Sequence, residues 1–402
     1  MVAPKMSDSH REDRKICFIA AVELTIRAFM VEHIKRLSKE NRITVVVNTD
    51  NVDFLMAYGL DVRVFPVKIE RRPSPFSDIR ALFRLYRFFK REGFDAVHSI
   101  TPKAGLIAML AAFLANIPVR IHTFTGQVWA KKEGIKRGVL KSADKLLALC
   151  ATHILTDSKS QQDFIVEQGI VLPGKSFVIG NGSICGVDNM RFRPDQKARM
   201  VLREQFLIPE NDVLFLFLGR LTFDKGLLDL AGAFSKLCRS VKNTHLLVAG
   251  PDEEGIKERA VSVCNNCFDK VHFYDFTDEP EKFMAAADVF CLPSYREGFG
   301  IVVIEAGSTG IPTIGTRIYG VIDAIEENAT GYLYEPGDVD ELFEKMQKMI
   351  DEPEVREGMG RSARERSIQL FSREYVTDAF LAFYNGIFFK NKDTGDIYEK
   401  DS

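Results

Sequence analysis

The sequence predicts an α/β protein made of two doubly wound domains, each built around a parallel sheet. Short apolar runs rich in β-branched residues alternate with helix-like segments, and the whole pattern begins again after residue 195. The 402 residues are too many for one ordinary core but fit two domains of about 150–200 residues each. Near-continuous apolar strands joined by helical crossovers indicate sheets that are covered on both faces.

The first half predicts one sheet and the helices around it. Residues 25–40 have a helical pattern, and the uncharged run at 104–119 is too short to span a bilayer, so we expect a buried helix there. Two basic amphipathic stretches, 76–94 and 129–147, are expected as further helices. The predicted strands are 15–20, 43–48, 62–67, 95–100, 119–125, 153–158 and 176–182.

The stretch GNGSICGVDNMRFRPD, residues 180–195, is rich in glycine and polar turn formers and predicts a hinge. A second sheet and a final helix, with Ser372 as its N-cap, are expected after it. The second set of predicted strands is 212–219, 244–250, 270–276, 287–294 and 311–316. The expected organisation is a domain over 15–185, a domain over 186–371, a helix crossing back at 372–390, and disordered ends at 1–14 and 391–402.

Charge is divided unevenly between the halves. Residues 1–180 hold 28 Lys and Arg against 18 Asp and Glu, whereas the remaining residues hold 26 against 38. We therefore expect the first half to meet an anionic partner, such as phosphate groups, a membrane surface or nucleic acid. The first fourteen residues lack the apolar core of a signal peptide, which predicts a cytoplasmic protein.

The seven cysteines are scattered, which favours free thiols. Cys264 and Cys267 form a single C-x-x-C pair without a second one. We interpret this pair as a surface turn, with a zinc or redox role as the less favoured alternative.

The segment FLGRLTFDKG, residues 217–226, places two cations around a loop at the end of a predicted strand. Ligands of such sheets bind outside the carboxyl ends of the strands, where Arg220 and Lys225 could hold a diphosphate. The alternative is two solvated surface cations.

The segment SYREGFGIVVIEAG places Glu297 before a helix that we expect to begin near Gly300, and Glu305 in its second turn. Free amides at the helix start suit an anion, and glycines let a ligand approach the backbone. Glu305 could accept hydrogen bonds from ribose hydroxyls, and Glu297 from a second sugar. The alternative is a helix cap and a surface charge.

These motifs, together with LLVAGPD and the segment 312–338, resemble the retaining glycosyltransferases of the family-4 type, the glycosyl transferases group 1. That family has the GT-B fold, in which two Rossmann-like domains face each other across a cleft. Its E-x7-E signature is matched by Glu297 and Glu305, and the resemblance covers about residues 15–390. HSITPKAG and HTFTGQVW are similar to bacterial enzymes of capsule, O-antigen and exopolysaccharide synthesis.

The resemblance implies sugar transfer with retention, without a metal or other cofactor, from a nucleotide-sugar to a saccharide acceptor. UDP is the expected nucleotide, and a polyprenyl-diphosphate-linked glycan is the expected acceptor, bound by the N-terminal domain. The implied donor site has Arg220 and Lys225 at the diphosphate, Glu305 at the ribose, Glu297 at the donor sugar as a catalytic residue, and Gly298, Phe299, Gly300 and Ile301 along the backbone.

In the first half, His122 is expected at the end of a strand that points into the cleft, where the family often has a histidine that contacts the donor sugar. The alternative is a histidine satisfied in the core. His98 and Lys103 are weaker candidates for acceptor binding. The chain departs from the family at Ala20 and Ala21, where many members have a Gly-Gly loop, so we transfer no ligand contact to that loop.

Two further function classes stay open. A UDP-sugar 2-epimerase on the same fold would convert its substrate without an acceptor, and a non-catalytic nucleotide- or glycan-binding protein would convert nothing. The cationic, aromatic stretches 76–94 and 129–147 suit an anionic membrane interface, with a solvated helix face as the alternative. Nucleic acid is disfavoured because no recognition fold is evident.

Overall fold

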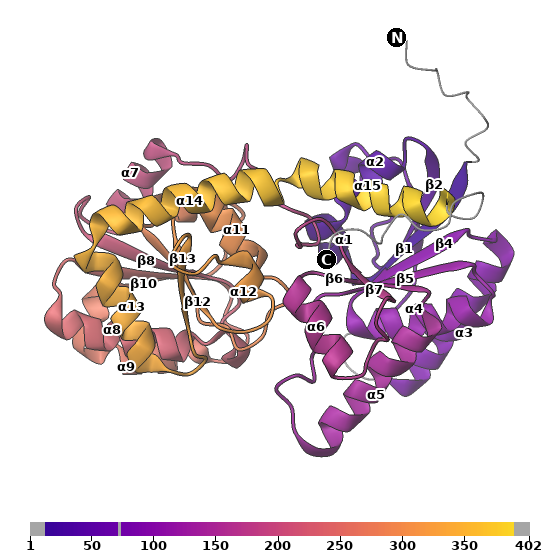
Figure 1. The fold of residues 1–402 in the computed structure, drawn as a ribbon, viewed down its shortest axis with the longest axis horizontal. Coiled ribbons are helices and arrows are strands. Elements are labelled where there is room, and N and C mark those ends of the chain that lie inside the picture. Colours follow the sequence, from indigo (N-terminus) through magenta and orange to yellow (C-terminus); the bar gives the residue numbers. More distant parts are fainter. Residues whose placement is uncertain (1–12, 71–73, 390–402) are drawn as a thin grey trace, which may run out of the picture.

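The computed structural model describes residues 13–70 and 74–389, and Figure 1 shows two α/β domains lying side by side. The first sheet has the order β3-β2-β1-β4-β5-β6-β7 and the second the order β10-β9-β8-β11-β12-β13. All the strand pairs in both sheets are parallel. Two parallel-sheet α/β domains agree with the predicted fold class.

The strands are β1 (Arg14–Val22), β2 (Asn41–Asn48), β3 (Arg63–Pro66), β4 (Ala96–Ile100), β5 (Val119–Phe124), β6 (His153–Thr156), β7 (Ser176–Val178), β8 (Val213–Leu218), β9 (Thr244–Ala249), β10 (Val271–Tyr274), β11 (Val289–Leu292), β12 (Thr313–Thr316) and β13 (Gly331–Tyr334). The first twelve lie where the apolar runs predict them. β13 was not predicted, because its residues, GYLY, begin with glycine and include no β-branched side chain.

The helices are α1 (Glu23–Phe29), α2 (Val31–Leu37), α3 (Pro75–Glu92), α4 (Pro102–Leu114), α5 (Gly134–Cys150), α6 (Lys159–Glu167), α7 (Gln196–Gln205), α8 (Leu227–Ser240), α9 (Ile256–Val263), α10 (Pro280–Ala286), α11 (Ile301–Ser308), α12 (Val321–Ala324), α13 (Val339–Asp351), α14 (Pro353–Phe371) and α15 (Arg373–Phe389). Helix α4 is the buried helix expected within 104–119, and it ends before β5 begins. No helix in the described ranges combines the length and apolar character needed to cross a membrane.

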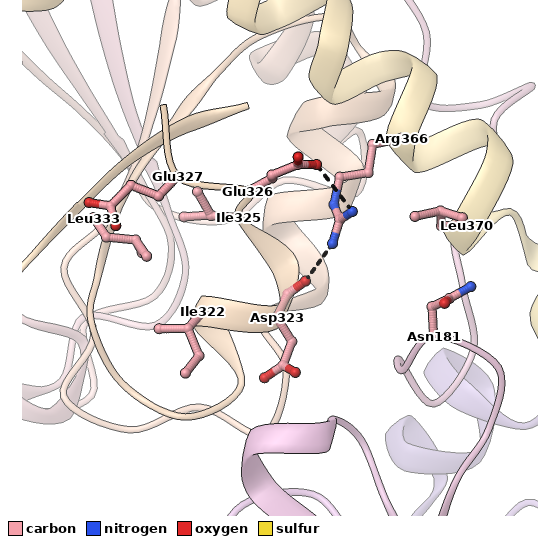
Figure 2. A pocket seen from close by; sticks show the side chains of 9 residues that line it. All are labelled: Asn181, Ile322, Asp323, Ile325, Glu326, Glu327, Leu333, Arg366 and Leu370. Atoms are coloured by element: carbon pink, nitrogen blue, oxygen red, sulfur yellow. Dashed lines mark hydrogen bonds and ion pairs between the residues drawn. The ribbon is translucent and has the colours of Figure 1, made fainter. Parts of the chain in front are cut away.

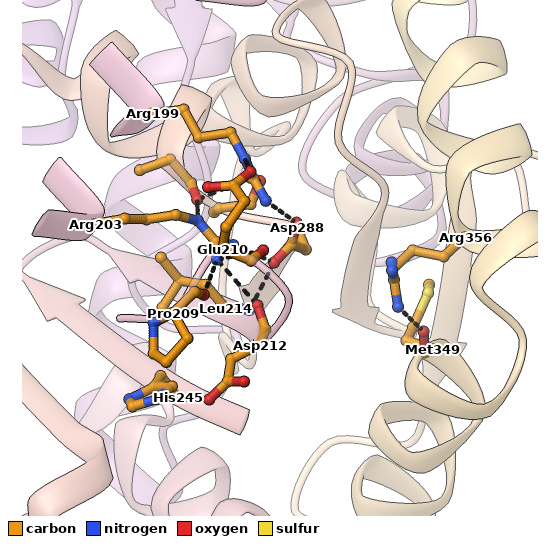
Figure 3. A network of polar contacts seen from close by, with 12 residues as sticks. Arg199, Arg203, Pro209, Glu210, Asp212, Leu214, His245, Asp288, Met349 and Arg356 are labelled. Carbon is orange, nitrogen blue, oxygen red and sulfur yellow. Dashed lines mark hydrogen bonds and ion pairs between the residues drawn. The ribbon is translucent and has the colours of Figure 1, made fainter. Parts of the chain in front are cut away.

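A buried polar network fixes the start of the second sheet (Figure 3). The Arg203 side chain on α7 is 2 % exposed, and its guanidinium donates to the Asp288 carboxylate at 2.5 Å and to the carbonyl oxygens of Ala286 and Pro209. Asp288 also accepts from the backbone N–H of Leu214 in β8. A buried charge is tolerated when it is paired and fully hydrogen-bonded, so this network ties α7 to the strands behind the site.

The chain crosses between the domains twice, and the two crossings are hydrogen-bonded to each other. The Val187 N–H donates to Phe371 O, and the Arg373 N–H donates to Val187 O, both at 2.8 Å. Helix α15 then runs along the first domain (Figure 1), where Phe380 stacks on His33 of α2 at a ring-centroid distance of 4.1 Å.

Two sequence expectations need correction here. Arg14 already belongs to β1, so the first domain starts one residue before the predicted boundary; the rest of the ends predicted as disordered, apart from Asp13, lies outside the described residues. Cys264 and Cys267 do not lie in a surface turn. Both thiols are buried in the core of the second domain, and the described cysteines are all free.

Candidate active site

The second sheet changes direction between β8 and β11, and the candidate site lies there. From β8 the chain goes outward through β9 and β10, then returns to place β11 on the other side of β8. The loops after β8 and β11 therefore diverge over opposite halves of the sheet and leave space for a ligand between them. These are the two loops that carry Lys225 and Glu297.

Lys225 and Glu297 meet at this point. The Lys225 ammonium lies 2.5 Å from Glu297 Oε1, and the Ser294 hydroxyl donates to the same oxygen at 2.8 Å. Gly226, directly after Lys225, has a φ of +68°, and a Cβ there would lie 1.9 Å from Pro293 O. The two loops can therefore pack this closely only because residue 226 is glycine.

Arg220 lies at the rim of the same region. Its side chain is 51 % exposed and forms a 2.8 Å ion pair with Glu253. An exposed pair of this kind contributes little to stability, so it costs little to exchange Glu253 for an anionic ligand. Lys225 and Arg220 are thus brought to one strand end, as the sequence predicts, while each is paired with a carboxylate.

Glu305 lies in the second turn of α11, the helix that begins after Gly300. Gly300 has a φ of +83°, which favours glycine, and its carbonyl accepts from the Val303 N–H at 2.8 Å, while the amides of Ile301 and Val302 have no carbonyl partner within the helix. The Glu305 carboxylate makes no hydrogen bond or ion pair with the described part of the chain. Burial raises its pKa to about 7, although the charges of Arg191 and Arg373 act in the opposite direction.

The turn before α11 is enclosed by the first domain. A Cβ on Gly298 would lie 2.6 Å from Asp157 Oδ2 and 2.8 Å from the carbonyl carbon of Thr125. Phe299 is buried and packs on Phe371 at 5.2 Å between ring centroids. The loops after β5 and β6 therefore touch the loop after β11, so the carboxyl ends of the two sheets meet across the domain interface.

Asp157 and Gln127 belong to this interface and were missed by sequence reasoning. Both side chains are buried, and Asp157 Oδ1 and Gln127 Nε2 have no hydrogen-bond partner among the described residues. Burial raises the pKa of Asp157 to about 8. For Asp157, the available signal was the polar pair Thr156–Asp157 at the end of an apolar strand. That pattern does not distinguish a residue of the site from a helix cap.

The prediction for His122 is wrong. It lies within β5, two residues before the strand ends, with no exposed surface. Its ring points toward α4, where Gly105 leaves space: a Cβ there would lie 2.3 Å from the imidazole. The Ser99 hydroxyl bonds to Nδ1 at 2.8 Å, and burial lowers the pKa to about 3, so the ring is neutral.

His98 is also a core residue rather than an acceptor contact. Its ring nitrogens bond to the Tyr384 hydroxyl at 2.8 Å and to Thr123 Oγ1 at 2.7 Å. Lys103 lies in the first turn of α4 and forms a 2.7 Å ion pair with Asp78 of α3. Of the acceptor candidates, Lys103 alone is partly exposed, with 22 % of its side chain accessible.

No group of three or more histidine, cysteine, aspartate or glutamate side chains in the described ranges is arranged to hold a metal ion.

Comparison with known proteins supports the family resemblance that the sequence motifs indicate. Residues 199–366 match the family model described as glycosyl transferases group 1, and residues 27–182 match a glycosyl transferase 4-like domain. The capsular polysaccharide biosynthesis glycosyltransferase CapM of Staphylococcus aureus is 31% identical over 380 residues, covering 93% of this chain and 97% of that protein.

Two other similarities are informative. The UDP-Gal:alpha-D-GlcNAc-diphosphoundecaprenol alpha-1,3-galactosyltransferase of Escherichia coli is 27% identical over 309 residues, covering 75% of this chain and 78% of that protein. The crystal structure of HepE from Anabaena in complex with UDP superposes with a TM-score of 0.76 at 18% identity, covering 93% of this chain and all of that one.

Proposed function

The chain belongs to the glycosyl transferases group 1, and we propose that it transfers a sugar, with retention of anomeric configuration, from a UDP-sugar to a saccharide carried on a polyprenyl diphosphate. The observation that carries the proposal is the meeting of Lys225 and Glu297 at the point where the second sheet changes direction. A cation that can bind a diphosphate therefore lies beside a carboxylate that can bind the hydroxyls of the attached sugar.

We assign the donor to the second domain. Arg220 and Lys225 would bind the diphosphate, the backbone amides from Gly298 to Ile301 at the start of α11 would complete its shell, and Glu305 would accept from the ribose hydroxyls. These cations would neutralise the leaving diphosphate, which allows transfer without a metal ion. UDP as the nucleotide is supported by the UDP-bound HepE structure and by the donor of the E. coli relative.

We assign Glu297 to the donor sugar as the catalytic residue that holds its hydroxyls. The departing diphosphate oxygen would take the proton of the attacking acceptor hydroxyl on the same face of the sugar. The C–O bond to the acceptor then forms where the C–O bond to the phosphate breaks, which retains the configuration. The Glu305 carboxylate has no partner in the described part of the chain, whereas Glu297 is paired with Lys225. Both observations fit these two roles, because Lys225 would leave Glu297 for the diphosphate when the donor binds. Glu297 would then be free to accept from the sugar hydroxyls.

We propose that the first domain binds the acceptor at an anionic membrane surface. Lys103 at the start of α4 is our candidate for the acceptor diphosphate. Helices α3 and α5 flank α4 (Figure 1) and expose apolar side chains among their lysines and arginines. The exposed apolar residues are Phe76, Ile79 and Phe83 on α3 and Ile135, Val139, Leu146 and Leu149 on α5.

Trp129 is not part of that surface, although its sequence position suggests it. It is buried and donates to Asp144 Oδ2 at 2.7 Å, while Arg137 and Lys141 lie over its ring. The tryptophan therefore anchors the basic helix to the domain, and the aliphatic side chains of α5 are the ones free to enter a lipid interface.

Product analysis tests the proposal. The purified chain is incubated with UDP-sugars, with and without a polyprenyl-diphosphate-linked saccharide, and the anomeric configuration of the product is determined by NMR. We expect an α-linked product from an α-linked donor, and only in the presence of the acceptor. Conversion of UDP-GlcNAc without an acceptor would identify a 2-epimerase instead, and binding without conversion would identify a non-catalytic protein.

A further inference from the structure

The N-terminus of α6 in the first domain is bonded to a carboxylate of the second domain. The backbone N–H of Ser160 donates to Asp323 Oδ1 at 3.3 Å, and the Ser160 hydroxyl donates to Asp323 Oδ2. The same hydroxyl accepts from the Gly320 N–H at 2.7 Å. Ser160 is thus both donor and acceptor in one contact that joins the two domains.

The charge of Asp323 suits this position. The first turn of a helix has unpaired amides and a partial positive charge, and a carboxylate there forms charge-assisted hydrogen bonds. Most helices take such a cap from their own chain neighbours. Here Ser158 is the N-cap within the first domain, and Asp323 is an additional cap supplied from the second.

The other contacts of Asp323 leave its carboxylate free to accept hydrogen bonds from the N-terminus of α6. Its backbone carbonyl accepts from the Arg366 guanidinium of α14 at 3.0 Å, and Glu326 pairs with the same arginine. Figure 2 shows the carboxylate directed away from Arg366, toward the helix below it. Phe164 of α6 also stacks on Tyr319, the residue before Gly320, with ring centroids 4.7 Å apart. This stack joins the same two segments as the Ser160–Asp323 contact.

This contact reaches the donor site through Gly320. A Cβ on Gly320 would lie 2.4 Å from Gly298 O, so the two glycines are packed backbone to backbone. The Ser158 hydroxyl donates to the same Gly298 oxygen at 3.3 Å. The peptide between Gly298 and Phe299, one residue beyond Glu297, is therefore held between α6 and the segment that α6 binds.

We infer that Asp323 and Ser160 are positioning residues, whose contact seats the first domain on the Gly298 turn and so orients Glu297 for transfer. The inference rests on the proposed function, because it assumes that Glu297 holds the donor sugar. Neither residue is among the side chains assigned to the nucleotide, which are Arg220, Lys225 and Glu305. The contact should therefore act on turnover much more than on nucleotide affinity, because Arg220, Lys225 and Glu305 keep their places when it is lost.

The test compares Ser160→Ala and Asp323→Ala with the wild type by kcat, by KM for the UDP-sugar and by calorimetric Kd for UDP. We expect kcat to fall about 10- to 100-fold, the loss expected from misplacing a sugar-holding group, while Kd for UDP stays within about twofold. The double variant should lose less than the product of the two single losses, because both single variants remove the hydrogen bond from the Ser160 hydroxyl to Asp323.

Matched variants separate positioning from folding. Ser160→Thr keeps the hydroxyl and should restore most of kcat, and Asp163→Asn removes an exposed carboxylate of α6 that pairs with Lys159 within the first domain, so it should leave kcat unchanged. Wild-type kcat in both alanine variants, or an equal loss of UDP affinity and kcat, overturns the inference while leaving the proposed function intact. A wild-type chain that transfers no sugar overturns the proposed function itself.

Discussion

The Lys225 ammonium lies 2.5 Å from the Glu297 carboxylate, and this ion pair joins the loops that follow β8 and β11. The two side chains are 21 % and 14 % exposed, so each is largely shielded from water. Removing one partner of such a pair leaves the other as an uncompensated, partly buried charge. A donor diphosphate that binds Lys225 would free Glu297 for sugar hydroxyls, and the prediction for Glu297→Ala depends on this exchange.

Glu297→Ala and Glu305→Ala should differ in what they lose. We expect Glu305→Ala to weaken UDP binding by about tenfold, the effect of one charge-assisted hydrogen-bond acceptor, with a matching loss of kcat/KM. Glu297→Ala should retain UDP binding and lose transfer, because it removes the sugar contact and leaves Lys225 available to the diphosphate. Calorimetry with UDP and steady-state kinetics measure both; equal losses of UDP affinity would contradict the division.

UDP affinity should depend on the ionisation of Glu305. Burial raises its pKa to about 7, so the carboxylate that accepts ribose hydrogen bonds is protonated as the pH falls toward 6. Between pH 8 and pH 6 the wild type should lose more affinity than Glu305→Gln, whose acceptor does not titrate. The phosphate of UDP titrates equally in both, so parallel pH profiles would remove Glu305 from the ribose.

His122→Asn should affect stability rather than chemistry. The ring fills the space over Gly105 and bonds to Ser99, so its truncation leaves a small void and should cost about 1–3 kcal/mol of unfolding free energy. Transfer per folded molecule should stay at the wild-type rate. Urea denaturation and kcat measured on the same samples decide this, with Ser99→Ala as the control that removes the same hydrogen bond.

Asp157→Asn should flatten the dependence of stability on pH. Burial raises the pKa of Asp157 from 3.8 to about 8, so the folded state keeps a proton that the unfolded chain releases. This contribution is fully present below about pH 4 and is lost as the pH rises through 8, with a slope of at most about 1.4 kcal/mol per pH unit. Urea melts of both proteins at pH 5, 6.5 and 8 measure the difference, and identical slopes would place the proton elsewhere.

Membrane binding should depend on the exposed faces of α3 and α5. Phe83 is 60 % exposed, and its replacement in Phe83→Asp adds a negative charge where we expect lipid contact. We expect severalfold weaker flotation with anionic liposomes at low salt. Phe223→Asp, at a residue 50 % exposed in the second domain, is the matched control. No flotation of the wild type would exclude the proposed surface.

The sequence by itself determined the two-sheet architecture and which residues follow strands β8 and β11. Strand runs are visible because both faces of a parallel sheet are apolar, and the loop residues are fixed by their place after a strand. That is why Arg220, Lys225, Glu297 and Glu305 could be named before any contact was known. β13 was not predicted because GYLY includes no β-branched side chain.

Tertiary structure alone decided which histidines are accessible and which residues join the domains. A one-residue shift along a strand reverses the face a side chain meets, so the end of β5 had to be located before His122 could be assigned to the core. Asp157 and the pair of Ser160 with Asp323 depend on how two separately folded sheets meet. Such contacts join residues more than a hundred positions apart, and no local period records them.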